Sequence, residues 1–231
     1  MIVFLVTMWI FALILWIIGI IPEPKRTEIF RTTVRIWMSL FFILTGCGFK
    51  VRGRKNFKKG ENYIVTCNHN SFMDVPCSTP FIPGPNKTIA KVEMSRIPIF
   101  GLIYKRGAVL VDRKDKDSRK NSFSRMKRVL DLGMHMCIYP EGSRNKTDQP
   151  LTAFHDGAFK LATETQKSII PAVIFNTRKI MPADKGFYFW PAKMEMHFLE
   201  PIPVVEGENY EVIKNKVFRV MEDYYNKNKK Q

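Results

Sequence analysis

The sequence predicts an α/β domain with a mostly parallel sheet flanked by helices, preceded by an N-terminal segment of two membrane-associated helices. From residue 51 onward, short apolar runs alternate with longer polar stretches of helical character. This alternation is typical of strand–helix–strand units, in which the strands pair in parallel. Residues 1–50 instead contain two long apolar stretches. We therefore expect two regions, a membrane anchor over residues 1–50 and an α/β domain over residues 51–231.

The first apolar stretch runs from Met1 to Pro22 and carries no charged residue. At about 1.5 Å per residue its length matches a hydrocarbon core of roughly 30 Å. It lacks a basic start and a small-residue cleavage site, which argues against a removable signal peptide. Positive charges first follow it at Lys25 and Arg26. The positive-inside rule therefore predicts a membrane-associated protein with the domain that follows this segment on the cytoplasmic face.

The second apolar stretch, Ile36 to Phe49, is too short to span a bilayer comfortably. It favours an interfacial helix with Trp37 at the level of the lipid headgroups. The alternative is an ordinary buried helix of the domain. Pro22 and Pro24 mark the expected break between the two helices.

The remaining elements follow from periodicity and from turn residues. Apolar, β-branched runs predict strands at Tyr63–Thr66, Lys87–Lys91, Ala108–Asp112, Met136–Tyr139, Ile169–Phe175 and Met194–Leu199. Helical patterns predict helices at Asp74–Thr79, Ser122–Leu132, Gly157–Thr165 and Tyr210–Tyr225. Pro171 interrupts its strand, which predicts a sheet edge or a bulge there.

Charge and cysteine content narrow the function classes. Lys and Arg outnumber Asp and Glu by 37 to 21, a formal net charge of +16, which indicates an anionic partner. The basic residues are dispersed and no nucleic-acid-binding motif is present, so nucleic acid is not the expected partner. The four cysteines are dispersed and form no C-x-x-C pair, so they indicate neither a zinc site nor a disulfide framework. His, Cys, Asp and Glu show no metal-ligand spacing, and we expect no metal.

The polar stretch Asn68–Asp74 directly follows a predicted buried strand. His69 would therefore lie where a strand gives way to a helix, a common position for chemistry in α/β proteins. Residues five apart diverge on a straight helix, so His69 and Asp74 can meet only across a turn. Asp74 would then fix the imidazole tautomer and leave the other nitrogen as a general base. The alternative is structural, because Ser71 to Asp74 also fits a helix capping box.

Two more strands end in charged residues. Gly107–Arg113 closes with an acid–base pair, and Ile138–Arg144 contains Glu141, Gly142 and Arg144. An ordinary solvated charge at Arg113 and a turn built on Pro140 and Gly142 are the simpler explanations.

Four blocks in order carry a family resemblance. They are Asn68-His69-x-Ser71-x-x-Asp74, Gly107-x-x-x-x-Asp112-Arg113, Tyr139-Pro140-Glu141-Gly142-Ser143-Arg144 and Ile170-Pro171-Ala172. Together they resemble the H-x-x-x-x-D glycerolipid acyltransferases of the 1-acylglycerol-3-phosphate acyltransferase type, over roughly residues 50–205. Phe154 to Phe159 also resembles a family segment, with His155 where a lysine is common. Tyr139, Ser143 and Ala172 are conservative departures from the family pattern.

The resemblance implies a reaction and a donor. A fatty acyl group would pass from an acyl thioester to the free hydroxyl of 1-acylglycerol 3-phosphate, giving phosphatidic acid in phospholipid biosynthesis. Acyl-coenzyme A or an acyl carrier protein would be the donor substrate, membrane lipids would be partners, and no cofactor would be needed. Glycerol 3-phosphate or another lysolipid is the alternative acceptor. A cysteine-dependent hydrolase using Cys67 or Cys77 and a non-enzymatic, membrane-tethered binder of anionic ligands are the alternatives from other classes.

The resemblance also implies roles for residues. His69 would be the general base and Asp74 its orienting carboxylate, while the backbone N–H groups of Asn70 and Ser71 would hold the oxyanion. The expected acceptor-binding residues for phosphate and glycerol are Arg113, Glu141, Gly142 and Arg144. Within this set, Arg113 and Arg144 would contact the phosphate, and Glu141 would hold an arginine or a glycerol hydroxyl.

Overall fold

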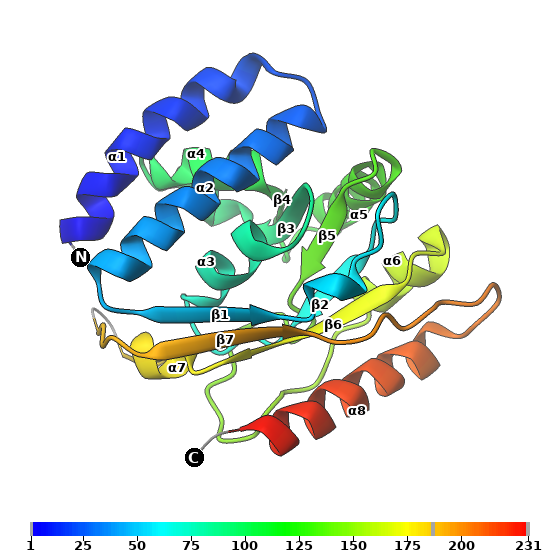
Figure 1. Ribbon diagram of the computed structural model, residues 1–231. Coiled ribbons are helices and arrows are strands. Elements are labelled where there is room, and N and C mark those ends of the chain that lie inside the picture. The colour runs from blue at the N-terminus through cyan, green and yellow to red at the C-terminus, as the bar shows by residue number, and fades with distance from the viewer. Residues whose placement is uncertain (1, 186–187, 230–231) are drawn as a thin grey trace.

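The central sheet has the strand order β1-β7-β6-β2-β5-β3-β4 in the computed structural model, which describes residues 2–185 and 188–229 (Figure 1). The strands are β1 (Gly48–Arg52), β2 (Ile64–Cys67), β3 (Asn86–Lys91), β4 (Ala108–Val111), β5 (His135–Ile138), β6 (Ile169–Phe175) and β7 (Lys193–Phe198). Only the β6–β7 pairing is antiparallel, and the other pairings are parallel. The prediction of a mostly parallel sheet is confirmed.

The predicted strands are all present, and their ends differ from the prediction by no more than one residue. Strand β1 was not predicted. Its apolar residues Phe49 and Val51 alternate with Lys50 and Arg52, so only one face carries the hydrophobic signal. In the sequence this strand also crosses residue 50, where the expected anchor ends and the expected domain begins.

Pro171 lies in the interior of the sheet, and the prediction of an edge strand is wrong. Strand β6 pairs with β2 on one side and with β7 on the other. The pairing on the β7 side is irregular next to Pro171: Ala172 pairs with Phe198, whereas Ile169 pairs with Ile202, so one extra residue lies in the segment after β7 rather than in β6. The irregularity suits a residue that has no N–H to donate.

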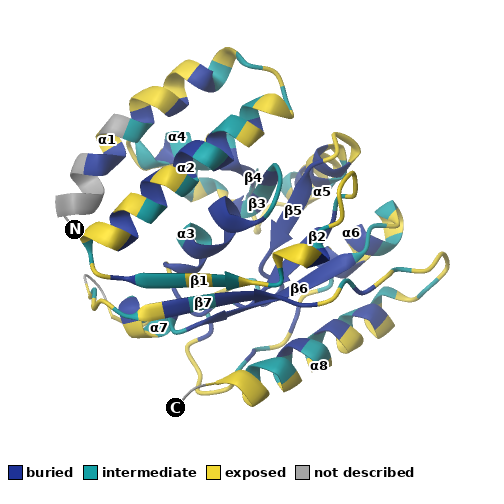
Figure 2. Ribbon diagram, viewed as in Figure 1, coloured by how far each residue is buried: buried dark blue, intermediate teal, exposed yellow. Residues whose placement is uncertain are grey.

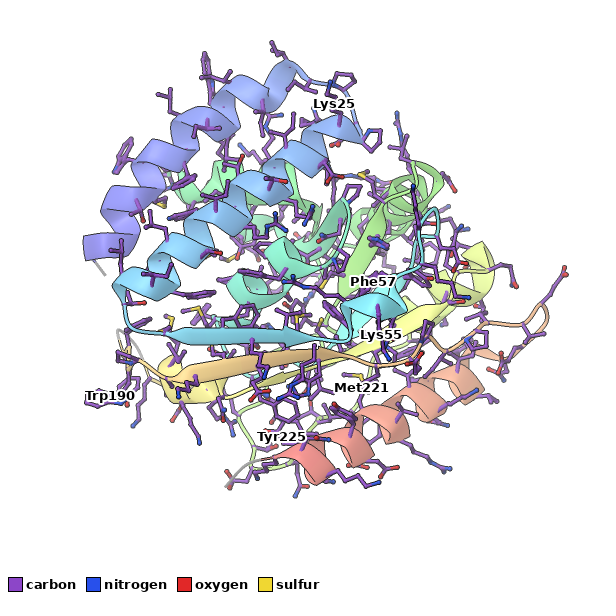
Figure 3. The ribbon with its side chains drawn as sticks, viewed as in Figure 1. Lys25, Lys55, Phe57, Trp190, Met221 and Tyr225 are labelled. Carbon is purple, nitrogen blue, oxygen red and sulfur yellow. The ribbon has the colours of Figure 1, made fainter. Side chains whose placement is uncertain are left out.

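Helices cover both faces of the sheet (Figures 1 and 2). The helices are α1 (Ile2–Ile17), α2 (Lys25–Leu44), α3 (Asp74–Ser78), α4 (Phe100–Gly107), α5 (Lys116–Asp131), α6 (Gly157–Thr165), α7 (Thr177–Ile180) and α8 (Tyr210–Asn228). Buried side chains of α1, α2 and α3 share one hydrophobic cluster, and those of α5, α6 and α8 share another. Met221 and Tyr225 of α8 point towards the sheet (Figure 3). The sheet therefore separates an α1–α4 layer from an α5–α6–α8 layer.

The N-terminal region contains two helices with Pro22 and Pro24 in the turn between them, as predicted. The second helix begins at Lys25 and ends at Leu44, so it starts earlier than the predicted stretch Ile36–Phe49, the end of which belongs to β1. The expected position of Trp37 is wrong: its side chain is 2% exposed, and its indole N–H donates to Thr7 Oγ1 at 2.8 Å. Because Trp37 lies on the face of α2 that packs against α1, it is buried between helices. Within the described ranges, none of the helices combines the length and apolar character that crossing a bilayer requires.

An ion cluster connects the turn between α1 and α2 to the sheet. Glu23 Oε1 accepts from Lys87 Nζ of β3 at 2.8 Å and from Arg26 at 2.7 Å. Burial raises the pKa of Glu23, but hydrogen bonds from Lys87, Thr27 and Arg26 outweigh this effect and lower the pKa to about 2. The two N-terminal helices are therefore held against the α/β domain by a charged contact as well as by packing.

His135, at the start of β5, is a buried histidine held neutral. Its Nδ1 accepts the backbone N–H of Tyr63 at 3.0 Å, and its ring stacks on that of Tyr63. Burial lowers the pKa of His135 from 6.5 to about 4. The unfolded chain therefore binds more protons than the folded chain between these pH values, so this site loses stability as the pH falls from about 6.5 to about 4.

We predict that His135→Asn removes this pH dependence, because Asn can still accept from Tyr63 through Oδ1 but has no basic nitrogen. The difference corresponds to about 3 kcal/mol of unfolding free energy for the 2.5-unit shift in pKa. Urea unfolding at pH 7.5, 6, 5 and 4 measures it. Parallel stability curves for wild type and variant over this range would contradict the prediction.

Candidate active site

The polar motifs meet at the carboxyl edge of the parallel strands. Strand β2 ends at Cys67, just before His69, and β5 ends at Ile138, just before the Tyr139–Arg144 segment. Strand β4 ends at Val111 and delivers Arg113, while β6 ends at Phe175 and leads into Thr177. Because parallel strands end at the same edge, four segments distant in sequence form one site.

His69 and Asp74 form a hydrogen-bonded pair. The distance from His69 Nδ1 to Asp74 Oδ2 is 2.9 Å, and the chain turns between the two residues before α3 begins at Asp74. The Asp74 side chain is fully buried, whereas the His69 side chain is 19% exposed. The carboxylate therefore faces the interior and fixes Nδ1, which leaves Nε2 for a substrate.

Asp74 is also the acceptor for the turn itself. Its Oδ2 accepts the N–H groups of Asn70 at 2.6 Å and Ser71 at 2.7 Å, and its Oδ1 accepts the hydroxyl of Thr177 at 2.5 Å. The contact to the N–H of Ser71 is the acidic half of a capping box. The structural and catalytic interpretations of Ser71–Asp74 are therefore compatible, because one carboxylate caps the turn and contacts the imidazole.

These contacts contradict the expectation that the N–H groups of Asn70 and Ser71 hold an oxyanion. Both groups point at the Asp74 carboxylate. A backbone donor directed at a buried carboxylate is not available to a developing alkoxide.

Glu141 holds the backbone of the histidine loop. Its Oε1 accepts the N–H of His69 at 2.7 Å, and its Oε2 accepts the N–H of Thr152 at 2.9 Å and the hydroxyl of the same threonine at 2.7 Å. Burial raises the pKa of Glu141, and these hydrogen bonds oppose the rise. Glu141 makes no contact to an arginine among the described residues, because main-chain and threonine donors are the groups that contact its two oxygens. Glu141 instead positions His69.

Asn68 ties the end of β2 to β6. Its Nδ2 donates to the carbonyl of Ile174 at 2.9 Å, and its Oδ1 accepts the N–H of Ile174 at 2.7 Å. The side chain is fully buried. It replaces the backbone pairing that β2 would have supplied had it continued, and so lets the chain turn at His69 without leaving Ile174 unpaired.

Arg113 and Gly142 are in contact at the rim of the site. The Arg113 guanidinium donates to the carbonyl oxygen of Gly142. Gly142 has φ +70°, and a Cβ there would lie 2.6 Å from Cδ2 of His155. The turn therefore requires glycine, and it brings together residues from three of the predicted motifs.

Arg144 lies over Phe72 of the histidine loop. Its Cζ is 3.5 Å from the centre of the Phe72 ring, a cation–π contact. Its NH1 is buried and has no hydrogen-bond partner among the described residues. An unpaired, desolvated guanidinium nitrogen beside an exposed aromatic ring can bind an anion.

An apolar cavity of about 470 Å³ opens beside the same loop. It lies in the α1–α4 layer, and its walls come from α2, the Phe72–Pro76 segment, α4 and the first residues of β3 and β4. Lining residues include Phe72, Pro76, Val34, Thr88, Gly107 and Ala108. Phe72 therefore separates the guanidinium of Arg144 from a deep hydrophobic space.

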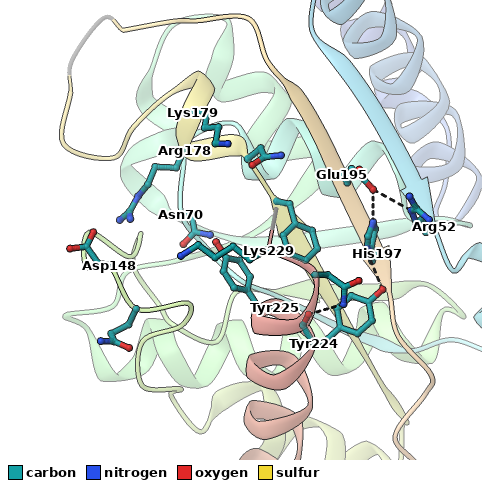
Figure 4. Close-up of a pocket in the computed structure, with 14 residues that line it drawn as sticks. Arg52, Asn70, Asp148, Arg178, Lys179, Glu195, His197, Tyr224, Tyr225 and Lys229 are labelled. Atoms are coloured by element: carbon teal, nitrogen blue, oxygen red, sulfur yellow. Dashed lines mark hydrogen bonds and ion pairs between the residues drawn. The ribbon is translucent and has the colours of Figure 1, made fainter. Parts of the chain in front are cut away.

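A second, polar cavity of about 600 Å³ lies on the α8 side of the sheet (Figure 4). Arg52, Glu195, His197 and Tyr224 form a connected chain of hydrogen bonds and ion pairs along one wall. On the other wall, Arg178 donates to the carbonyls of Asn145 and Thr147 at 2.7 Å each. These bonds fix the Asn145–Thr147 segment, and the N–H of Asn145 in turn donates to the carbonyl of His69 at 2.6 Å.

Thr177 and Arg178 support the site but were not identified from the sequence. Both follow β6, at the same sheet edge as the other motifs. The polar sequence Asn176-Thr177-Arg178 directly follows a buried strand, and the same feature marks His69 as a candidate site residue.

Neither Cys67 nor Cys77 supports the hydrolase alternative. Both thiols are fully buried, and burial raises the pKa of each well above its usual value. The Sγ of Cys67 lies 3.8 Å from that of Cys137, and Cys77 contacts Met194. A buried thiol with a raised pKa is a poor nucleophile.

We predict that Asn68→Ala destabilises the fold by about 2–4 kcal/mol, because two buried backbone groups of Ile174 lose their partners. Urea unfolding measures the loss, and amide hydrogen exchange at Ile174 should accelerate. Asn121→Ala, at an exposed position of α5, is the matched control and should change stability by less than about 1 kcal/mol. Equal effects of the two substitutions would contradict the prediction.

Comparison with known proteins agrees with this geometry. A protein-family model described as Acyltransferase matches residues 48–175, more than half of the chain. The matched range contains His69, Asp74 and both of the predicted arginines.

Similar sequences carry one name. A protein of Helicobacter pylori, 1-acyl-sn-glycerol-3-phosphate acyltransferase, is 34% identical over 163 residues, covering 70% of this chain and 67% of that protein. The chloroplastic 1-acyl-sn-glycerol-3-phosphate acyltransferase LPAT1 of Arabidopsis thaliana is 30% identical over 179 residues, covering 74% of this chain but only 49% of its own length. The human 1-acyl-sn-glycerol-3-phosphate acyltransferase alpha is 26% identical over 197 residues, 84% of this chain and 69% of that protein.

The fold has a solved counterpart. The crystal structure of the 1-acyl-sn-glycerophosphate acyltransferase PlsC from Thermotoga maritima superimposes with a TM-score of 0.75 and 22% identity, covering 90% of this chain and 83% of that one. At this identity the superposition establishes the fold alone. With the family model and the sequence relatives, the four ordered motifs identify the chain as a member of the acyltransferase family, of the 1-acyl-sn-glycerol-3-phosphate acyltransferase type.

Proposed function

We propose that this protein transfers a fatty acyl group from an acyl thioester to the free hydroxyl of 1-acylglycerol 3-phosphate, giving phosphatidic acid. One observation carries the proposal. A histidine oriented by a buried carboxylate lies at a sheet edge with an unpaired guanidinium and an apolar cavity beside it. A base, an anion site and an apolar space are the parts needed to acylate a phosphorylated lipid alcohol.

His69 removes the proton of the acceptor hydroxyl through Nε2. The alkoxide oxygen attacks the thioester carbonyl, a tetrahedral oxyanion forms, and its collapse breaks the C–S bond and expels a thiolate, which takes up the proton. Asp74 accepts from Nδ1 and stabilises the imidazolium that exists between these steps. The acceptor is itself the nucleophile, so no covalent enzyme intermediate is required.

Arg144 and Arg113 bind the acceptor phosphate. Arg144 supplies the buried and unpaired NH1, and its position over Phe72 holds the guanidinium plane beside the histidine loop. Arg113 contacts the segment that carries Arg144, through the carbonyl of Gly142. Gly142 shapes the acceptor pocket. Glu141 acts indirectly, by accepting the backbone N–H of His69 and so positioning the base.

The apolar cavity accommodates an acyl chain. Its lining is almost entirely hydrophobic and includes Gly107 at the end of α4 and the paired residues Thr88 of β3 and Ala108 at the start of β4. A chain entering beside Phe72 would therefore extend away from the reacting carbonyl along the sheet. Burial of each methylene contributes about 0.8 kcal/mol.

The N-terminal helices bring the site to the membrane from its cytoplasmic face. Among the side chains that the structure describes, the large apolar ones exposed in this region are Trp9, Leu13, Ile14, Trp16, Ile17, Ile20, Ile36, Leu40, Ile43 and Leu44. Exposure of so many apolar side chains to water is unfavourable, whereas the same side chains suit the headgroup–acyl boundary of a bilayer. Both acceptor and product partition into that boundary.

We predict that His69→Ala lowers the rate of acyl transfer by about 10²–10⁴-fold without unfolding the protein, because the general base is lost. Asp74→Asn should lower the rate at unchanged acceptor affinity, since the wrong histidine tautomer is then favoured. Membranes containing the full chain are assayed with a labelled acyl thioester and three acceptors: 1-acylglycerol 3-phosphate, glycerol 3-phosphate and a lysolipid with a zwitterionic headgroup.

We expect the highest rate of acyl transfer with 1-acylglycerol 3-phosphate as the acceptor. Preference for glycerol 3-phosphate would replace the proposed acceptor but keep the chemistry. Transfer to none of the three, or near-normal turnover in His69→Ala of confirmed fold, would overturn the proposed function.

We predict that Arg144→Ala raises the KM for 1-acylglycerol 3-phosphate by about 10–100-fold, the loss of a charge-assisted contact worth about 1.5–3 kcal/mol. The KM for the acyl donor should change little. Arg54→Ala, an exposed arginine in the connection before β2, is the matched control. An unchanged acceptor KM in Arg144→Ala would remove this residue from the phosphate site.

A further inference from the structure

The helix α5 and the turn before it carry one of the two most basic runs of the described chain, the other being residues 50–59, whose net charge is also +6. Over residues 113–128 there are eight cations and two acids, a net charge of +6. The cations are Arg113, Lys114, Lys116, Arg119, Lys120, Arg125, Lys127 and Arg128. Lys127 is paired with Glu164. This net charge of +6 is a large part of the +16 of the whole chain, and the packing of α5 against the domain does not require it.

Most of these side chains lie on the solvent face of α5. The opposite face is buried through Ser122, Met126, Val129 and Leu130. Lys116, Arg119 and Lys120 are exposed and lie within one turn of each other, at the start of the helix. We call this exposed group, with Arg125 and Arg128, the α5 basic face. Like charges held this close repel one another, which favours binding of a polyanion.

The α5 basic face begins at the edge of the active site. Strand β4 delivers Arg113 to that edge, and α5 follows after a short turn in which Ser118 Oγ accepts the N–H of Asp112 at 2.9 Å. Arg113 contacts Gly142. A macromolecule bound to the first turns of α5 would therefore lie next to the loops that surround His69.

The α5 basic face and the apolar surface of the N-terminal helices belong to opposite layers of the fold. Helix α5 packs with α6 and α8 in one hydrophobic cluster, and α1 and α2 belong to the cluster on the other side of the sheet (Figure 1). When the exposed side chains of α1 and α2 contact a bilayer, the α5 basic face is turned towards water. An anionic lipid surface is therefore not its natural ligand.

A small phosphorylated ligand is also a poor fit. A phosphate group is bound where several donors converge in a concave site. Neither the apolar nor the polar cavity is lined by a residue of α5. A row of exposed cations on a convex helix instead suits a protein with an acidic surface.

We propose that the α5 basic face docks the donor, an acidic carrier protein that holds the acyl group as a thioester. This proposal rests on the proposed function and selects the carrier-bound form of the donor over acyl-coenzyme A. Charge attraction guides the carrier to α5, and its thioester arm then reaches over the adjacent rim to His69.

The test is a triple charge reversal, Lys116→Glu/Arg119→Glu/Lys120→Glu, in the full-length protein. The matched control is Arg54→Glu/Lys58→Glu/Lys59→Glu, an equal change of charge at exposed positions before β2. Each protein is assayed with the same acyl chain on acyl carrier protein and on coenzyme A, at low and high salt. Binding to anionic vesicles is measured in parallel.

The α5 variant should raise the KM for acyl carrier protein thioester by about tenfold or more at low salt, and high salt should reduce the difference. Turnover with acyl-coenzyme A and vesicle binding should stay within about twofold of wild type. The control variant should leave both donors unaffected. Together these results would support docking on α5.

Three results would overturn the proposal. They are an unchanged KM for the carrier thioester, an equal loss with both donors, and loss of vesicle binding in the α5 variant alone. Failure of the wild type to use either donor would instead disprove the proposed function itself, so the two failures are distinguishable.

Discussion

The carboxylate of Asp74 is the interaction on which the site depends. It is fully buried, and four donors contact it: the imidazole of His69, two backbone N–H groups and the hydroxyl of Thr177. A buried carboxylate without such donors would cost several kcal/mol. Each donor comes from a segment that has to be folded correctly, so the orientation of the histidine depends on β2, α3 and the end of β6 together.

The second layer of support acts on the backbone of the histidine loop rather than on its side chains. Glu141 accepts from the N–H of His69, and Asn145 donates to its carbonyl. Asn68 fixes the preceding residue to β6. The loop therefore has little freedom to move, and the imidazole can stay partly exposed without losing its position. The segment that holds His69 also carries Arg144, which couples the placement of the base to that of the anion site.

The sequence predicted the strands and the dyad because both leave local signals. Apolar β-branched runs mark buried strands, and a histidine ringed by polar residues after such a run marks a sheet edge. Contacts between distant segments leave no such signal, so the hydroxyl of Thr177 and the backbone role of Glu141 were missed. The backbone donors of Asn70 and Ser71 were assigned to an oxyanion because sequence does not reveal which way an N–H points. Trp37 was misplaced because an apolar helix face looks the same whether it meets lipid or another helix.

Helix α2 explains why the N-terminal region and the α/β domain cannot be understood separately. Its inner face lines the apolar cavity through Val34 and Trp37, and its outer face exposes Ile36, Leu40 and Ile43. One helix thus forms both a wall of the acyl-chain site and part of the surface directed at lipid. Glu23 ties the same helix pair to β3, which supplies Thr88 to the lining of the cavity. Any shift of α2 on a bilayer must therefore alter the shape of the cavity, because opposite faces of this one helix form the cavity wall and the exposed apolar surface.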